Sequence, residues 1–140
     1  MELNSLASLV HRELRSERTG EKFSLSATLT ESMGFNKLFV HHEILPPGRR
    51  ASSPHSHSLN EELIFVLEGH PTAVLNDKRI ELAPGGFIGF HPGTGELHYL
   101  ENTTEQEVRV LVAVARDSQD QVTYSPYHIP SSSSPSGSSK

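Results

Sequence analysis

The chain has 140 residues, of which 34% are hydrophobic and 21% are charged, and its formal net charge is −5. This length suits one domain with a single modest core. The acidic balance argues against a nucleic-acid-binding face, which would need concentrated positive charge. Because the chain has no cysteine, disulfide scaffolds, thiolate zinc sites and cysteine nucleophiles are excluded. The nine histidines point instead to metal or proton chemistry.

Targeting signals are not evident in the sequence. No stretch approaches the ~20 consecutive apolar residues that a membrane-spanning helix requires. The opening residues, MELNSLASLV, lack the basic start and the unbroken apolar run of a secretory signal peptide. We therefore expect a cytoplasmic protein that associates with neither membranes nor nucleic acids.

Three regions follow one another along the chain. In residues 1–20, apolar side chains recur at intervals of three and four, which predicts a partly helical N-terminal arm. The residues on this apolar stripe are Leu3, Leu6, Val10 and Leu14. Residues 21–129 are predicted to form an all-β domain, because short apolar runs alternate with turn residues about every ten positions. Residues 130–140 are rich in serine, and we expect a disordered tail there.

Eight strands are predicted within the all-β domain. Their apolar or alternating runs are Phe23–Thr30, Leu38–Leu45, Glu62–Leu67, Thr72–Leu75, Arg79–Leu82, Phe87–Phe90, His98–Glu101 and Val108–Ala115. The pair Asn76-Asp77 separates two of these runs and is a hairpin signal. The last run is apolar on both faces after Arg109, which indicates a central strand.

Two histidines, His55 and His57, are separated by a single residue. On an extended chain such residues point to the same side, so their imidazoles can share a metal ion. Glu62 opens the next predicted strand and His98 opens a later one, and the four side chains converge if the sheet closes on itself. Three neutral imidazoles and one carboxylate suit one divalent transition metal: iron, manganese, zinc, nickel or cobalt. From spacing alone, a pair of exposed turn histidines remains the alternative.

The residues around these candidates form two ordered segments. The first contains Gly48, His55, His57, Glu62 and Gly69, and the second contains Gly86, Pro92, Gly95, His98 and Asn102. In this order and spacing they resemble the two motifs of the cupin superfamily, and the resemblance covers roughly residues 37 to 115. Each segment has one residue more than the family pattern, and both insertions fall in predicted turns, where an extra residue is tolerated.

The resemblance implies a cupin-type jelly-roll β-barrel with a metal ion inside it, and often a homodimer. Carried over by position, the metal ligands would be His55, His57, Glu62 and His98. Glu61 competes with Glu62 for the ligand role, but the spacing to Gly69 and the parity of the strand favour Glu62. The chain is also similar to a branch of small bacterial single-domain cupins, some of which are labelled sugar-phosphate isomerases.

Such a site favours a small, oxygen-rich substrate. A divalent ion with one carboxylate ligand keeps a net charge of about +1, which stabilises a substrate that becomes anionic in the transition state. Isomerisation or epimerisation of a sugar or sugar phosphate fits this requirement. Iron-dependent dioxygenase chemistry fits the same ligands, and a non-catalytic ligand-binding or sensor module is the third alternative.

An isomerase also needs a general base near the substrate. His42 is a candidate because it shares strand parity with apolar neighbours, which predicts that it points inward and that the adjacent His41 faces the other side. Tyr99 is a second candidate beside the later motif. His91 and Glu101 are further candidates in the same region. Two adjacent arginines, Arg49 and Arg50, could bind a phosphate, but arginines in a turn are more often solvated.

Overall fold

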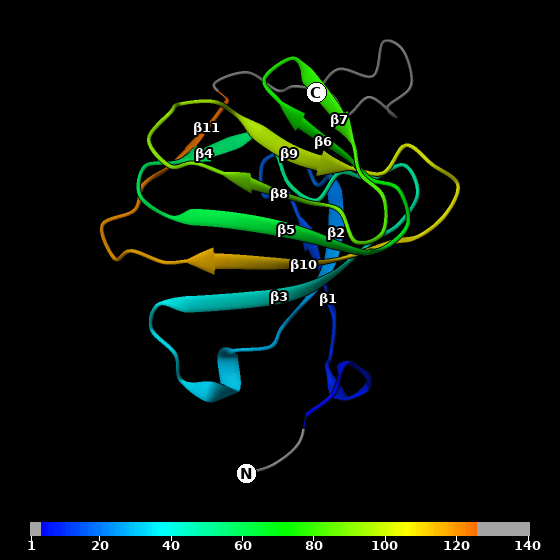
Figure 1. Cartoon of the computed structure of the whole chain (residues 1–140), viewed down its shortest axis with the longest axis horizontal. Helices are drawn as coiled ribbons and strands as arrows, with labels where there is room; N and C mark the ends of the chain where they lie inside the picture. Colours follow the sequence, from blue (N-terminus) through cyan, green and yellow to red (C-terminus); the bar gives the residue numbers. More distant parts are fainter. Residues whose placement is uncertain (1–3, 126–140) are drawn as a thin grey trace.

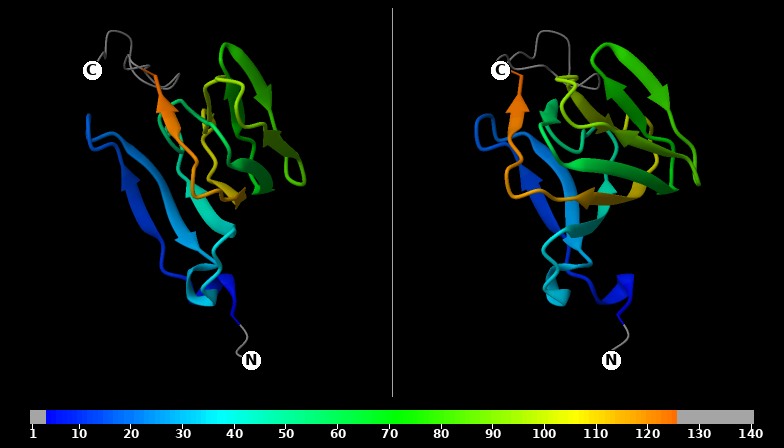
Figure 2. Two further views of the ribbon diagram at one scale, coloured as in Figure 1. Left: turned by 90° about the vertical axis from the view of Figure 1, so that its left-hand side faces the viewer. Right: turned by 60° about the vertical axis from the view of Figure 1, so that its left-hand side comes forward.

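The computed structural model describes residues 4–125, which form two antiparallel sheets packed face to face, as Figures 1 and 2 show. One sheet has six strands in the order β1-β2-β3-β10-β5-β8, and the other has five in the order β11-β4-β9-β6-β7. This arrangement confirms the predicted all-β jelly roll. The predicted serine-rich tail, 130–140, lies outside the described residues. Within residues 4–125, no helix has the length and apolar character needed to cross a membrane.

The larger sheet is built around β10. Its strands are β1 (Arg12–Arg15), β2 (Lys22–Thr28), β3 (Leu38–Leu45), β5 (Glu61–Glu68), β8 (Phe87–Phe90) and β10 (Val108–Ala115). Strand β10 pairs with β3 on one side and with β5 on the other. The prediction that this apolar run is a central strand is therefore confirmed.

The smaller sheet carries the two histidine motifs. Its strands are β4 (His55–His57), β6 (Thr72–Leu75), β7 (Lys78–Glu81), β9 (His98–Glu101) and β11 (Val122–Tyr124). The predicted hairpin is confirmed: Leu75 pairs with Lys78, and Asn76 has the positive φ of 54° that such a turn requires. The backbone N–H and Oδ1 of Asn76 also bond to the backbone of Leu97 at 2.7 and 3.0 Å. The hairpin thereby holds the chain just before His98.

The N-terminal arm contains little helix. In its described part the predicted helical periodicity survives only as a 3-10 turn, η1 (Leu6–Ser8), and a second 3-10 turn, η2 (Glu31–Met33), follows β2. After this turn, Arg12–Arg15 of the arm form β1, which pairs with β2. An isolated helix this short is marginal in water, so the arm is more stable as a strand paired with the edge of the sheet than as a helix. The arm therefore belongs to the sheet and brings Leu14 to the wall of the interior cavity.

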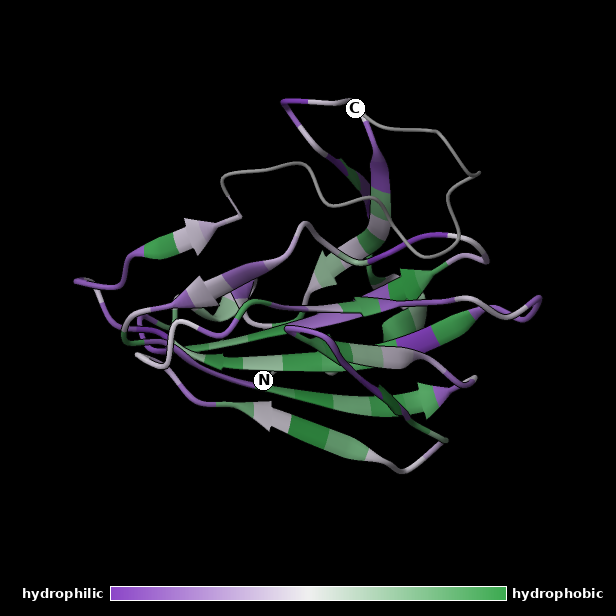
Figure 3. Cartoon of the chain, turned by 90° about the horizontal axis from the view of Figure 1, so that it is seen from above, coloured by the Kyte–Doolittle hydropathy of each residue, from purple (hydrophilic) through white to green (hydrophobic). Residues whose placement is uncertain are grey.

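The core lies between the two sheets. Its buried members are Leu45, Ile64, Val66, Ala73, Phe90, Leu100, Val108, Val110, Val112 and Val114. Figure 3 shows hydrophobic stretches along the strands and hydrophilic connections between them. Gly69, at the end of β5, has a φ of 85°, and a Cβ there would lie 2.7 Å from the Glu107 carbonyl oxygen. Only glycine fits at this close approach.

Candidate metal centre

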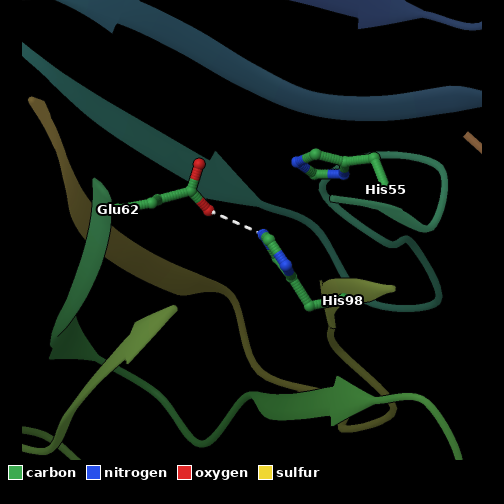
Figure 4. Close-up of side chains that lie close together, drawn as sticks. All are labelled: His55, Glu62 and His98. Carbon is green, nitrogen blue, oxygen red and sulfur yellow. Dashed lines mark hydrogen bonds and ion pairs between the residues drawn. The ribbon is translucent and has the colours of Figure 1, made fainter. Parts of the chain in front are cut away.

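Three of the four predicted ligands meet inside the barrel. Nitrogen or oxygen atoms of His55, Glu62 and His98 all lie within 4.8 Å of one another, and Figure 4 shows the three side chains gathered in one place. The two histidines are cross-strand partners on β4 and β9, whereas Glu62 reaches them from β5 in the opposite sheet. The Glu62 Oε1 atom lies 3.1 Å from His98 Nε2. The neighbouring Glu61 is exposed, so the preference for Glu62 over Glu61 agrees with their placement.

His57 lies beside this group and not within it. Its Nε2 atom is 3.7 Å from Glu62 Oε2, and its ring centroid is 5.2 Å from that of His55 and 6.3 Å from that of His98. The Nδ1 atom of His57 donates a hydrogen bond to Asp120 Oδ2 at 2.9 Å. This leaves the electron pair of the neutral ring on Nε2, the nitrogen nearer to Glu62.

Packing and hydrogen bonds also orient the other two histidines. His55 Nδ1 donates to the Ser53 carbonyl oxygen at 2.8 Å, so Nε2 holds the free electron pair of the neutral ring. The His98 ring stacks on Phe90 with centroids 3.9 Å apart and planes inclined by 4°. Imidazole nitrogens with a carboxylate are a donor set that divalent transition metals accept. The residues present therefore fit the metal that the resemblance implies.

Protonation in the site favours the forms that bind metals. Burial lowers the pKa of His55, and the positive charge of protonated His98 adds to that effect. Burial would raise the pKa of Glu62, but its hydrogen bond with His98 and the charges of nearby histidines lower it overall. These shifts favour a neutral His55 facing an ionised Glu62, the forms of these two groups that metal coordination requires.

The group opens onto an interior cavity of about 310 Å³. Besides the four predicted ligands, the polar and charged side chains that line it are His41, Glu43, Ser52, Asn60, Tyr99 and Arg116. Apolar walls come mainly from strands of the larger sheet. The cavity is therefore a partly open space with ionisable groups from both sheets, large enough for a small polar molecule.

The two suggested catalytic residues have different positions. Tyr99 is buried and lines the cavity. The inward orientation predicted for His42 is wrong, because Phe39, His41 and Glu43 are the β3 residues that line the cavity, and side chains alternate along a strand. The buried His42 instead has its Nδ1 2.8 Å from Nε2 of His11 on the other face.

The remaining candidates lie away from the cavity. His91 is exposed, and Glu101 is fully buried in an ion pair with Arg79. Neither arginine of the predicted phosphate site lines the cavity: Arg49 bonds to Glu13 at 3.1 Å. Arg50 is only 1% exposed and holds Glu21 through two hydrogen bonds of 2.9 Å. It is thus a buried structural arginine, which differs from the solvated side chain expected for a turn.

Sequence reasoning missed two carboxylates near the site. Asp120 orients His57 from 63 positions away, a contact that depends on β11 pairing with β4. Glu43 lies in the cavity wall on β3. The one signal for Glu43 was a carboxylate between apolar residues and two histidines in a predicted strand, which a buried polar role would explain.

Comparison with solved structures gives the same fold. A sugar phosphate isomerase of the cupin superfamily from Silicibacter pomeroyi DSS-3 is 24% identical to this chain. The two superpose with a TM-score of 0.80, and the alignment covers 89% of this chain and 82% of that one. A putative sugar phosphate isomerase from Acidithiobacillus ferrooxidans is 24% identical, with a TM-score of 0.75 and coverage of 87% of this chain and 80% of that one. The polyketide cyclase RemF from Streptomyces resistomycificus is 24% identical, with a TM-score of 0.74 over 89% and 84%.

Identities this low establish a common architecture and not a common reaction. No curated protein matches the chain. The model of the cupin domain family matches residues 41–114, a span that contains all four predicted ligands and most of both sheets. Because this match covers more than half of the sequence, the chain belongs to the cupin domain family.

Proposed function

We propose that this cupin is a metal-dependent enzyme that isomerises or epimerises a small oxygen-rich molecule of the sugar or sugar-phosphate class. The observation that carries the proposal is the His55–Glu62–His98 group in the wall of an interior cavity of about 310 Å³. That volume is at the lower end of the range of about 300–1,000 Å³ for small-molecule sites. Ionisable side chains that are not predicted ligands share the cavity, as a catalytic site requires.

In this proposal His55, Glu62 and His98 hold one divalent transition metal, and His57 is the fourth ligand. When bound, such an ion would polarise substrate oxygens and stabilise developing negative charge. The chain itself supplies the orientation: Ser53 and Asp120 fix the rings of His55 and His57, and Phe90 fixes that of His98. Tyr99 remains a candidate for contact with the substrate.

A phosphate or other anionic group on the substrate is supported by Arg116. Among residues 4–125, it is the one arginine that lines the cavity, and its guanidinium lies 4.7 Å from the ring centroid of Phe39. An arginine held over an aromatic face can still present N–H donors to a phosphate. Two of the similar solved structures are named as sugar phosphate isomerases, which agrees with this choice of substrate class.

We further propose that the protein is a cytoplasmic homodimer. The outward-facing residues of β5 and β8 form an exposed apolar face made of Leu63, Phe65, Leu67 and Phe87. The rings of Phe65 and Phe87 stack with centroids 6.4 Å apart. A contiguous face of this kind is typical of a protein interface, and a second copy of the chain is its simplest partner.

The proposal is tested by metal content and by proton exchange in substrates. Metal is measured by mass spectrometry in the untagged wild type, in a His57→Ala/Glu62→Ala variant and in a Glu61→Ala control. We expect near-stoichiometric metal in the wild type and the control, and its loss in the double variant. Each metal-loaded protein is then incubated in D₂O with a panel of sugars and sugar phosphates, and NMR follows exchange at carbons next to the carbonyl.

Exchange that requires Glu62 but not Glu61 would support the isomerase. Iron with substrate-dependent oxygen uptake would favour the dioxygenase alternative. Stoichiometric metal with ligand binding but no exchange would favour the binding-module alternative. Absence of metal after growth in supplemented medium would overturn the proposal.

A further inference from the structure

The carboxylate of Glu43 lies in the wall of the metal-site cavity without an obvious structural purpose. It projects from β3, in the middle of the larger sheet, and the residue is only 8% exposed. Ser24 Oγ donates a hydrogen bond to Oε1 at 2.7 Å. The second oxygen, Oε2, lies 3.7 Å from His41 Nδ1, beyond hydrogen-bond distance.

A buried carboxylate normally has a lysine, an arginine or several N–H donors around it. In the part of the chain that the structure describes, no lysine or arginine forms an ion pair with Glu43. The charged and titratable groups that face it are His41 on its own strand and Glu62 from β5. Burial and the negative charge of Glu62 raise the pKa of Glu43 to about 7, although the Ser24 hydrogen bond opposes them. A group poised near neutrality can both accept and donate a proton.

Other cavity residues are less suited to this role. Glu62 belongs to the predicted ligand group. His41 Nδ1 lies 3.2 Å from Ser26 Oγ, and burial lowers the pKa of its ring. Glu43 thus lies in the cavity wall and is not one of the predicted metal ligands. One of its oxygens, Oε2, accepts no hydrogen bond from the described residues.

We propose that Glu43 is the proton-transfer residue of the cavity, which takes a proton from a bound substrate and returns it to a neighbouring atom. This inference rests on the proposed function and supplies its general base. In an isomerisation, the C–H bond beside the carbonyl breaks, its electron pair stays on the substrate as an enediolate, and the proton joins Glu43 Oε2. A hydroxyl proton passes to the former carbonyl oxygen. Return of the first proton to the adjacent carbon forms the new C–H bond, so nothing is oxidised or reduced overall.

The test uses acetohydroxamate, a small chelator that loses one proton when it binds a metal ion. Binding to the metal-loaded protein is followed calorimetrically at pH 8 in two buffers of different ionisation enthalpy, which counts the protons released to solution. In the wild type we expect almost no release, because Glu43 takes the proton. In Glu43→Gln we expect about one proton released per ligand, because the amide cannot accept it. A Glu61→Gln control should behave like the wild type.

The outcomes separate the two proposals. Hydroxamate binding with equal proton release in the wild type and Glu43→Gln would overturn the role of Glu43 and leave the proposed function standing. Failure of hydroxamate to bind the metal-loaded wild type would overturn both. Metal content and melting temperature, measured for every variant, show whether Glu43→Gln keeps the fold and the metal. Once a substrate is known, Glu43→Gln should lower kcat by about 100-fold or more with little change in KM.

Discussion

The hydrogen bond of 2.9 Å from His57 Nδ1 to Asp120 Oδ2 joins the end of β4 to the segment just before β11. The other oxygen of Asp120, Oδ1, accepts hydrogen bonds of 2.8 Å from the backbone N–H groups of Leu59 and Asn60. One carboxylate therefore fixes the ring of His57 and the turn that follows it. Burial would raise the pKa of Asp120, but these hydrogen bonds and the charge of His57 lower it to about 2.

Replacement of Asp120 by alanine should weaken metal binding without removing a ligand. Loss of a partner that orients a ligating histidine typically costs about 10- to 100-fold in metal affinity. Competition with a chromophoric chelator measures the affinity directly. Asp117→Ala is the control, because Asp117 is exposed and its Oδ1 caps only the N–H of Gln119. An unchanged affinity in Asp120→Ala would show that His57 is not a ligand or is oriented without Asp120.

The strands of the barrel could be predicted because their sequence alternates or runs apolar between clear turn residues. Three strands could not be predicted: β1, β4 and β11 have only three or four residues each and no run of buried apolar side chains, so they depend on pairing with neighbouring strands. Asp120 could not be predicted for the same reason, since only the pairing of β11 with β4 brings it to His57.

The choice of His42 over His41 failed for a more specific physical reason. Residues on both faces of β3 are buried or partly buried, so hydrophobic alternation does not mark the inner face. That face is partly polar, because His41 and Glu43 line the cavity beside Phe39, whereas Val40 and Ile44 flank His42 on the other face. A cavity lined by ionisable side chains reverses the usual rule that the more apolar side of a strand faces inward.

The raised pKa of Glu43 predicts a characteristic dependence of stability on pH. Below pH 4.5 the carboxyl group is protonated in the folded and the unfolded chain; as pH rises from 4.5 towards 7, only the unfolded chain ionises. The free energy of unfolding should therefore fall across this window and level off above it. Glu43→Gln cannot ionise, so relative to it the wild type should lose on the order of 1–3 kcal/mol between pH 5 and pH 8.

Urea unfolding of the metal-free proteins at these two pH values measures this difference. Other titrating groups are common to both proteins, and those that do not interact with Glu43, such as Asp120, cancel in the comparison. Glu61→Gln, an exposed change on β5, should show no pH-dependent difference from the wild type. Parallel curves for wild type and Glu43→Gln would mean that Glu43 ionises as easily in the folded chain as in the unfolded one.

Arg116 should determine the preference for anionic ligands. Arg116→Gln removes the positive charge in the cavity, so the affinity for a sugar phosphate should fall about tenfold or more, while that for the corresponding neutral sugar changes little. Titration calorimetry with both ligands gives the two affinities. Arg109→Gln is the control, since Arg109 is on β10, the strand that ends just before Arg116, and pairs with Glu68 and Glu107. Equal losses for both ligands would contradict phosphate recognition by Arg116.

The exposed apolar face of β5 and β8 should hold two copies of the chain together. Phe87 is 66% exposed and Phe65 38% exposed, and each aromatic ring buried in an interface can contribute more than about 1 kcal/mol. A Phe65→Ser/Phe87→Ser variant should therefore raise the dissociation constant of the dimer by about 30-fold or more. Light scattering across a dilution series should show the variant dissociating to a monomer of 15.4 kDa at concentrations where the wild type stays dimeric.

Ile80→Ser is the control, because Ile80 is 39% exposed on β7 of the opposite sheet. A wild type that is monomeric throughout the series would refute the dimer, and dissociation caused equally by Ile80→Ser would place the interface on the smaller sheet.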